Sequence, residues 1–167
     1  RGASAAGILS GWELHGLMQV QTGPPFGPQV GFDRANITDG DQDLSQRPDL
    51  VSAPGTDLIL GGVEQYFDPM AFGLPEAGFL GNLGRNVLTG PGLASVDLAL
   101  HKILWTRESH SVRLRVEAFN VLNRPNFQVP SDIDLFNSRG QRIPTAGRIT
   151  STTTTSRQLQ IAARWDF

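Results

Sequence analysis

The sequence predicts an all-β fold built on an antiparallel sheet, and three observations lead to this prediction. Four segments of about 11 residues alternate between apolar and polar positions, which is the period of a strand with one apolar face. The 167 residues include 19 Gly and 11 Pro, which break long helices. The four segments are joined by one short turn and two very long loops.

The composition excludes several classes of function. The 14 Lys and Arg against 16 Asp and Glu give a net charge of −2, so the chain has no positive field for nucleic acid and no nucleic-acid partner is expected. The absence of Cys excludes disulfides, cysteine zinc sites and thiol catalysis. No apolar run approaches 18 residues, so no transmembrane helix is expected. Because Arg1 is not preceded by Met or a signal-peptide pattern, we expect the C-terminal part of a longer protein.

The predicted strands cover 12–22, 94–104, 112–122 and 157–167. Each has an apolar and a polar face, with Leu17 as an apolar exception on the polar face of the first strand. In chain order, the apolar faces contain Trp12, Leu14, Gly16, Met18 and Val20; Ala94, Val96, Leu98, Leu100 and Leu104; Val112, Leu114, Val116 and Ala118; and Leu159, Ile161, Ala163, Trp165 and Phe167.

The length of these strands favours a transmembrane barrel. At ~3.3 Å per residue and a tilt near 45°, each spans roughly 25 Å, the height of the apolar band of an outer-membrane barrel. Seven of the nine charged residues in the strands lie on the polar face, and the other two, Lys102 and Arg157, lie near strand ends, where long basic side chains reach water. A soluble sheet with one wet face gives the same alternation and stays open as an alternative.

The connections also favour the barrel. A five-residue turn, 106–110, joins the second and third strands, whereas the loops 23–93 and 123–156 are long. Outer-membrane barrels combine short periplasmic turns with long extracellular loops, and a periplasmic C-terminus places both long loops outside. Trp12, Trp105 and Trp165 then form an aromatic girdle at the periplasmic interface, although the parity of Trp105 is wrong for the lipid face, so we expect it in the turn.

Catalytic and metal sites are weakly indicated. Asp39, Asp41 and Asp43 have the spacing that begins a calcium loop, but the residues at its sixth and twelfth positions are leucines, which favours a solvated acidic turn. The three His have no metal-binding spacing along the chain. Asp97 and Glu117 could lie close together on neighbouring strands, but charge balance against nearby arginines explains them better than acid–base catalysis. We therefore expect no enzyme activity, no metal site and no cofactor.

Several motifs occur in a fixed order along the chain. They are Gly11–Leu14 with Gln21–Phe26, Tyr66–Phe72, Gly81–Asn86 with Gly90–Gly92, Glu117–Phe127, and Gly147–Thr150 with Arg157–Gln160, followed by the terminal Phe167. In this order they resemble the C-terminal end of TonB-dependent outer-membrane receptors of the Oar-like group, in which a carboxypeptidase-regulatory-like domain precedes the plug and the barrel. The loop residues that carry the resemblance are Gly84, Arg85, Asn86, Gly90, Pro91, Gly92, Asn120, Asn123, Pro125, Asn126 and Phe127.

The resemblance implies a place in the bacterial outer membrane and a set of partners. The whole barrel would have about 22 strands, of which this chain supplies about four, as a fragment of the larger barrel. The expected partners are outer-membrane lipid, the β-barrel assembly machinery, TonB through missing N-terminal regions, and an unidentified extracellular ligand. The last strand matches the assembly signal of such barrels, which is thought to be read by strand pairing and consists of Leu159, Ile161, Ala163, Trp165 and Phe167.

Two other functions remain open at this point. The chain could belong to a non-transport barrel used for adhesion or surface structure, in which the long loops are the working part. It could also be a soluble β-sandwich that binds glycans and packs its apolar face against a second sheet.

Overall fold

The computed structural model describes residues 9–37 and 46–167, and these form two compact units. Of the described residues, 9–21, 93–126 and 153–167 belong to the strand unit, and 22–37, 46–92 and 127–152 belong to the loop unit. The three aspartates considered for calcium, Asp39, Asp41 and Asp43, lie outside the described residues.

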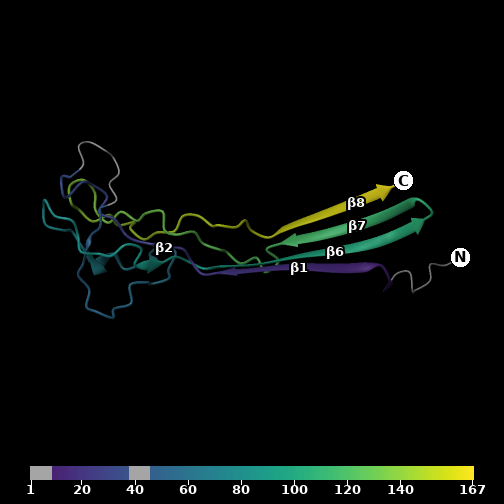
Figure 1. Cartoon of the computed structure of the whole chain (residues 1–167), viewed down its shortest axis with the longest axis horizontal. Coiled ribbons are helices and arrows are strands. Elements are labelled where there is room, and N and C mark those ends of the chain that lie inside the picture. The colour runs from purple at the N-terminus through teal and green to yellow at the C-terminus, as the bar shows by residue number, and fades with distance from the viewer. Residues whose placement is uncertain (1–8, 38–45) are drawn as a thin grey trace. The chain divides into compact units, whose positions relative to one another are not determined.

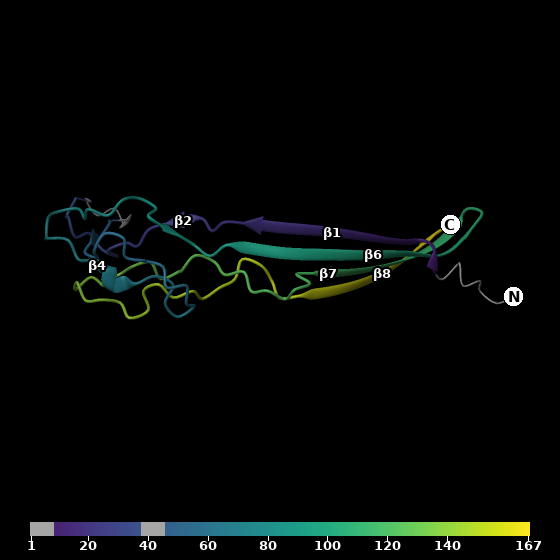
Figure 2. The same cartoon turned by 90° about the horizontal axis from the view of Figure 1, so that it is seen from below.

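The strand unit is one antiparallel sheet of four strands, which confirms the predicted fold class. The strands are β1 (Trp12–Gln21), β6 (Leu93–Arg107), β7 (His110–Phe119) and β8 (Gln158–Asp166), in the spatial order β1-β6-β7-β8. Figures 1 and 2 show them side by side in this order. β1 and β8 are the two edges, so the sheet does not close on itself, as expected for a fragment of a larger barrel.

The hairpin between β6 and β7 is tighter than predicted. The sequence suggested a five-residue turn, 106–110, but β6 continues to Arg107 and β7 begins at His110. Only Glu108 and Ser109 connect them, and Glu108 has the left-handed φ of 54° that short hairpins commonly need. The predicted third strand ends earlier, at Phe119, because Asn120 has a φ of 47°. Arg157, predicted to begin the last strand, precedes β8.

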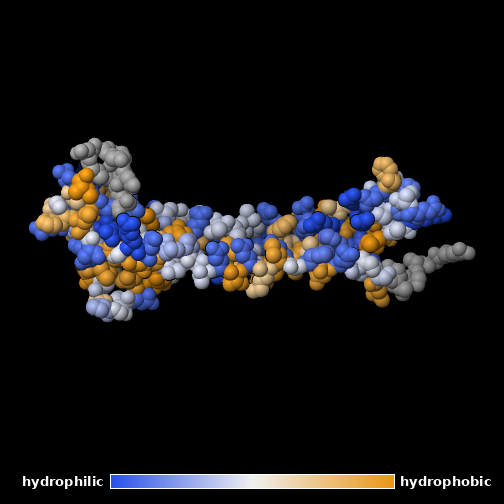
Figure 3. All heavy atoms as spheres, in the orientation of Figure 1, coloured by the Kyte–Doolittle hydropathy of each residue, from blue (hydrophilic) through white to orange (hydrophobic). Residues whose placement is uncertain are grey.

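The cross-strand register places the predicted apolar residues on one face, except Leu104, which has no partner on β7, and Phe167, which follows β8. Leu14 pairs with Leu100, Leu100 with Val116, and Val116 with Ile161, so one apolar row crosses all four strands. At the two edges this row is open, since Leu14 is 71% exposed and Ile161 is 72% exposed. Figure 3 shows hydrophobic side chains at the surface along the strands. A sheet with such a face needs an apolar environment.

A β-bulge in β6 changes the expected position of one tryptophan. Ile103 pairs with Arg113, and the next pair is Trp105 with Val112, so Leu104 is an extra residue in the ladder. One extra residue reverses the alternation beyond it. Trp105 therefore lies on the apolar face within β6, and the expectation that it lies in the turn was wrong.

The loop unit has a hydrophobic core of its own, although its sequence has no regular apolar period. Its elements are β2 (Pro25–Phe26), β3 (Asp49–Leu50), the 3₁₀ helix η1 (Pro69–Ala71), β4 (Phe72–Gly73) and β5 (Leu88–Thr89). β2 pairs with β5, and β3 pairs with β4. The buried cluster consists of Phe26, Val30, Tyr66, Phe67, Ala71, Phe72, Leu83, Leu88, Leu135, Phe136, Ala146 and Ile149.

Two glycine motifs lie against each other in the loop unit. A Cβ atom on Gly23 would lie 1.8 Å from the carbonyl oxygen of Gly90, so only glycine fits at this position. The Gly90 N–H donates to the Pro24 carbonyl at 2.9 Å. The motif at 21–26 and the motif at 90–92 are therefore parts of one structural element.

No helix among the described residues is long and apolar enough to cross a membrane.

Candidate functional site

The C-terminal strand presents its alternating apolar residues on one face. Ala118, Val116, Leu114 and Val112 of β7 are, in that order, the cross-strand partners of Leu159, Ile161, Ala163 and Trp165. Phe167 follows the strand, is 89% exposed, and has its ring 5.9 Å from that of Trp165. Within the described residues, the other edge of β8 has no strand partner. The strand therefore offers both an apolar face and a free edge for pairing.

The three tryptophans lie toward the same end of the sheet, where β6 turns into β7. Val112 pairs with Trp105 on one side and with Trp165 on the other. The ring of His110 lies 6.5 Å from each of these two tryptophan rings. Trp12 belongs to the neighbouring row, where it pairs with Lys102. The arrangement is an aromatic band on the apolar face, as a membrane interface favours.

Lys102 is a cation on the apolar face, and its charge is satisfied locally. Its ammonium donates a hydrogen bond to the Ser10 carbonyl and lies 4.9 Å from the centre of the Trp12 ring. The residue is only 6% exposed. Lys102 was expected near the end of its strand, but β6 continues to Arg107, and Lys102 lies opposite Trp12 at the start of β1. A cation held by a carbonyl and an aromatic ring avoids the cost of an unpaired charge facing lipid.

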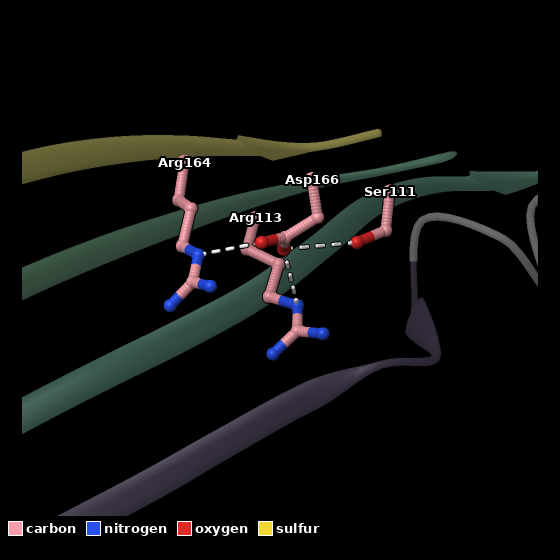
Figure 4. A network of polar contacts seen from close by, with 4 residues as sticks. All are labelled: Ser111, Arg113, Arg164 and Asp166. Atoms are coloured by element: carbon pink, nitrogen blue, oxygen red, sulfur yellow. Dashed lines mark hydrogen bonds and ion pairs between the residues drawn. The ribbon is translucent and has the colours of Figure 1, made fainter. Parts of the chain in front are cut away.

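The polar face carries paired charges on β7 and β8. Asp166 accepts a hydrogen bond from Arg164 at 2.7 Å and one from the Ser111 hydroxyl at 3.3 Å, and it lies 3.7 Å from Arg113. Figure 4 shows these side chains on the same side of the sheet. Acidic and basic groups thus contact each other on this face, as in the polar lumen of a barrel.

The two carboxylates considered for catalysis are held by different partners. Glu117 pairs with Arg115 at 2.5 Å. Asp97 accepts the backbone N–H of Asn120 at 2.8 Å. Glu117 therefore has the arginine partner that the charge-balance interpretation predicts, whereas Asp97 is held by a backbone N–H instead of an arginine.

The asparagines of the motif at 117–127 tie strand ends together. The Asn120 side-chain amide donates to the carbonyls of Arg124 and Thr155, both at 3.0 Å. Asn123, with a φ of 50°, accepts the backbone N–H of Arg157 at 3.0 Å. The approach to β8 is thereby fixed to the end of β7.

Asn126 completes this asparagine clamp, which we define as Asn120, Asn123 and Asn126. Its side-chain oxygen accepts the Ala94 N–H at 2.8 Å, and its amide donates to the Thr154 hydroxyl at 3.0 Å. The residue is 1% exposed. The start of β6 is therefore tied to the segment that leads into β8. The sequence pointed to these residues as a motif but did not indicate that their role is to position strands.

The other motif residues lie in the loop unit or beside the clamp. Asn86 adopts the left-handed φ of 52°, and Gly84, Arg85 and Asn86 border a surface hollow of about 770 Å³. Phe127 packs against the core of the loop unit. Pro91 and Gly92 are the last residues of the first segment of the loop unit. Pro125 directly precedes Asn126 of the clamp.

The register also brings together three residues that sequence spacing separates. Glu13 pairs directly with His101 across β1 and β6, and His15 lies two residues further along the same face. In the sequence, the Glu-X-His pattern of the first strand places Glu13 and His15 on the same face. Only the register of β1 against β6 shows that His101 lies beside them.

The comparisons with known proteins give one match. The family model for an outer membrane beta barrel domain matches residues 2–160. The comparison with curated proteins and the comparison with solved structures gave no match.

Proposed function

Because the chain belongs to the outer membrane beta barrel domain family and is a barrel segment in the bacterial outer membrane, we propose that its barrel is that of a TonB-dependent receptor or transporter of the Oar-like group. The chain contributes wall, surface loops and the C-terminal assembly signal, and it has no catalytic role. The observation that carries this proposal is the ordered series of motifs, which runs from Gln21–Phe26 to Glu117–Phe127 and ends in an apolar last strand.

The two faces of the sheet support the assignment of lipid and lumen. The row from Leu14 to Ile161 faces lipid, and the Asp166 network faces the interior. With β8 running toward the periplasm, the hairpin at Glu108 and Ser109 is periplasmic and the loop unit is extracellular. The free edge of β8 and the terminal Phe167 are the parts that the assembly machinery pairs with.

The loop unit is the part that meets an extracellular ligand. Its packed core of twelve buried residues gives it a fixed surface rather than a set of independent turns. The hollow beside Arg85 and Asn86 has the size of a small-molecule site.

Binding to TonB tests the proposal. The full-length protein, purified in detergent, is mixed with the purified periplasmic domain of TonB, and complex formation is followed by size exclusion. A plug-containing receptor serves as the positive control, and a porin without a plug as the negative control. Co-elution is expected; failure to bind while the receptor control binds would reject the receptor assignment.

A non-transport surface or adhesion barrel is the second candidate. The independent core of the loop unit favours it, because a folded surface module can act without any transport through the barrel. Absence of TonB binding together with attachment of cells to a surface, lost on removal of 27–87, would support this candidate. A soluble sandwich is no longer considered, since the family resides in the outer membrane.

A further inference from the structure

We propose that Glu13, His15 and His101 form a binding site for one divalent transition-metal ion of the Zn²⁺ type on the polar face of the sheet. The proposal concerns the wall of the barrel and does not depend on coupling to TonB. The three residues are called the β1–β6 cluster below.

The backbone register brings the three side chains together. Glu13 and His15 lie two residues apart on β1, so both point to the polar face. His101 is the direct cross-strand partner of Glu13 on β6. The rings of His15 and His101 have their centres 4.9 Å apart. One ligand atom from each residue lies within 4.8 Å of the ligand atoms of the other two.

The donor set and its spacing suit zinc. Two imidazole nitrogens and one carboxylate oxygen, with a fourth position left for water, make up a common zinc coordination. Ligands at about 2.0–2.2 Å from a tetrahedral ion lie about 3.4 Å apart. His15 Nε2 and Glu13 Oε2 are 3.7 Å apart. Their side chains are 60% and 62% exposed, so small rotations can close the remaining distance.

His101 has an unsatisfied polar atom at the cluster. Its Nε2 atom is buried and has no hydrogen-bond partner among the residues that the structure describes. Buried polar atoms are normally satisfied, and an unsatisfied one calls for an explanation. A metal ion bound to the ring, or water held by that ion, supplies the missing interaction.

The neighbouring positive charges are engaged elsewhere. Arg115 is the cross-strand partner of His101 on β7, and its guanidinium contacts Glu117 at 2.5 Å. Arg113 and Arg164 contact Asp166 at 3.7 and 2.7 Å. These carboxylates reduce the repulsion that the arginines exert on a cation at the β1–β6 cluster.

Metal binding at this position links two neighbouring strands. Since β1 and β6 each contribute at least one ligand, a bound ion stabilises their pairing and therefore the folded barrel. Zn²⁺ is the probe of the site. Cu²⁺ checks the type of site, because the Irving–Williams order predicts that a site of nitrogen and oxygen ligands binds Cu²⁺ more tightly than Zn²⁺.

The test is titration of the full-length protein with Zn²⁺. The protein is folded in detergent, stripped with EDTA and dialysed, and Zn²⁺ binding is measured in competition with a chromophoric chelator. The variants are Glu13→Gln, His15→Ala and His101→Ala. His110→Ala is the matched control, because His110 lies on the apolar face outside the cluster. The heat-dependent shift of the barrel on gels verifies that each variant is folded.

The expected result is one equivalent of Zn²⁺ that the wild type and His110→Ala bind equally. Each cluster variant loses that equivalent or binds it at least about tenfold more weakly, the smallest loss that removal of even an outer partner of a metal ligand usually causes. Zn²⁺ should also raise the unfolding temperature of the wild type and not that of folded His101→Ala. Equal binding by wild type and by a folded variant that carries all three substitutions, or no binding by wild type, would overturn the proposal. Zn²⁺ binding by a protein that does not bind TonB would still support it.

Discussion

Trp105 and Trp165 occupy the same row of the sheet, because both pair with Val112 from opposite sides of β7. They lie on β6 and β8, far apart in the sequence, and only the extra residue at Leu104 gives Trp105 the parity to join this row. The row therefore depends on a single bulge.

Deletion of Leu104 should leave Trp105 on the apolar face. Ile103 already pairs with Arg113 and Trp105 with Val112, so removal of the extra residue makes these pairs consecutive and restores simple alternation. The measurement uses the full-length protein with Trp12 and Trp165 replaced by Phe, and Trp105→Phe in the same background gives the emission of any other tryptophans. Brominated lipid should quench the Trp105 emission to the same extent with Leu104 present and with Leu104 deleted. Quenching that rises on deletion would mean that Trp105 faces away from lipid while Leu104 is present, which would contradict the role of the bulge.

Replacement of Phe167 by Ala should lower the amount of assembled barrel in the outer membrane severalfold. The terminal aromatic ring follows the free edge strand and makes its ring contact with Trp165, so its role is expected in recognition during assembly. Phe79→Ala is the matched control, because Phe79 is also exposed, at 62%, but lies in the loop unit. Folded protein is measured by its heat-dependent gel shift in membrane fractions. Equal levels of the two variants would speak against the terminal signal.

Replacement of Asn126 by Ala should destabilise the sheet by about 1–3 kcal/mol. The substitution removes a buried side chain and leaves the partly buried Ala94 N–H and Thr154 hydroxyl without their partner. Asn82→Ala is the control: Asn82 also accepts a backbone N–H, from Leu50, but at an exposed site, and should cost less. Reversible urea unfolding in lipid vesicles gives both values. A loss for Asn126→Ala no larger than for the control would refute the clamp.

Tyr66 should make the stability of the loop unit fall at high pH. Burial raises the pKa of its phenol, whose hydroxyl donates to the Thr89 carbonyl at 3.0 Å. A raised folded-state pKa means that the stability contribution is intact below the unfolded pKa of about 10 and is lost as the pH rises through the folded value. The absorbance difference at the phenolate band between wild type and Tyr66→Phe should titrate above pH 10. Tyr66→Phe should lack this part of the pH dependence. Titration of the Tyr66 phenol at or below its ordinary pKa would contradict the prediction.

The sequence was sufficient for the strands because each carries its own period. Leu159, Ile161 and Ala163 alternate without interruption, and the structure places them on the apolar face as expected. Alternation could not place Trp105, since the bulge that reverses its parity lies in the pairing of Leu104 with the neighbouring strand and not in a local signal. The turn at Glu108 was predicted too long because short and long turns contain the same kinds of polar residue. The left-handed φ that lets Glu108 close a short hairpin is not visible in the sequence.

The contacts between distant segments could not be derived from local pattern. Phe67 and Phe72 belong to a core assembled from residues with no common period, so the loop sequence looked like a series of turns. Asn126 was recognised as part of a motif, but its partners, Ala94 and Thr154, lie 32 and 28 residues away. The same holds for His15 and His101, which only strand register brings together.

The asparagine clamp gives the second long connection a fixed entrance and exit. The Asn126 carbonyl accepts the Thr153 N–H at 2.7 Å, so the chain leaves toward 127–152 and returns at the same place. Once these ends are joined, lengthening the intervening chain adds a closure cost that grows only with the logarithm of its length. The strands can therefore keep their register while residues 127–152 change in length. This segment contributes Leu135, Phe136, Ala146 and Ile149 to the core that it shares with 22–92, so the two long loops must change together. In this way the surface of this barrel can diversify without redesign of its wall.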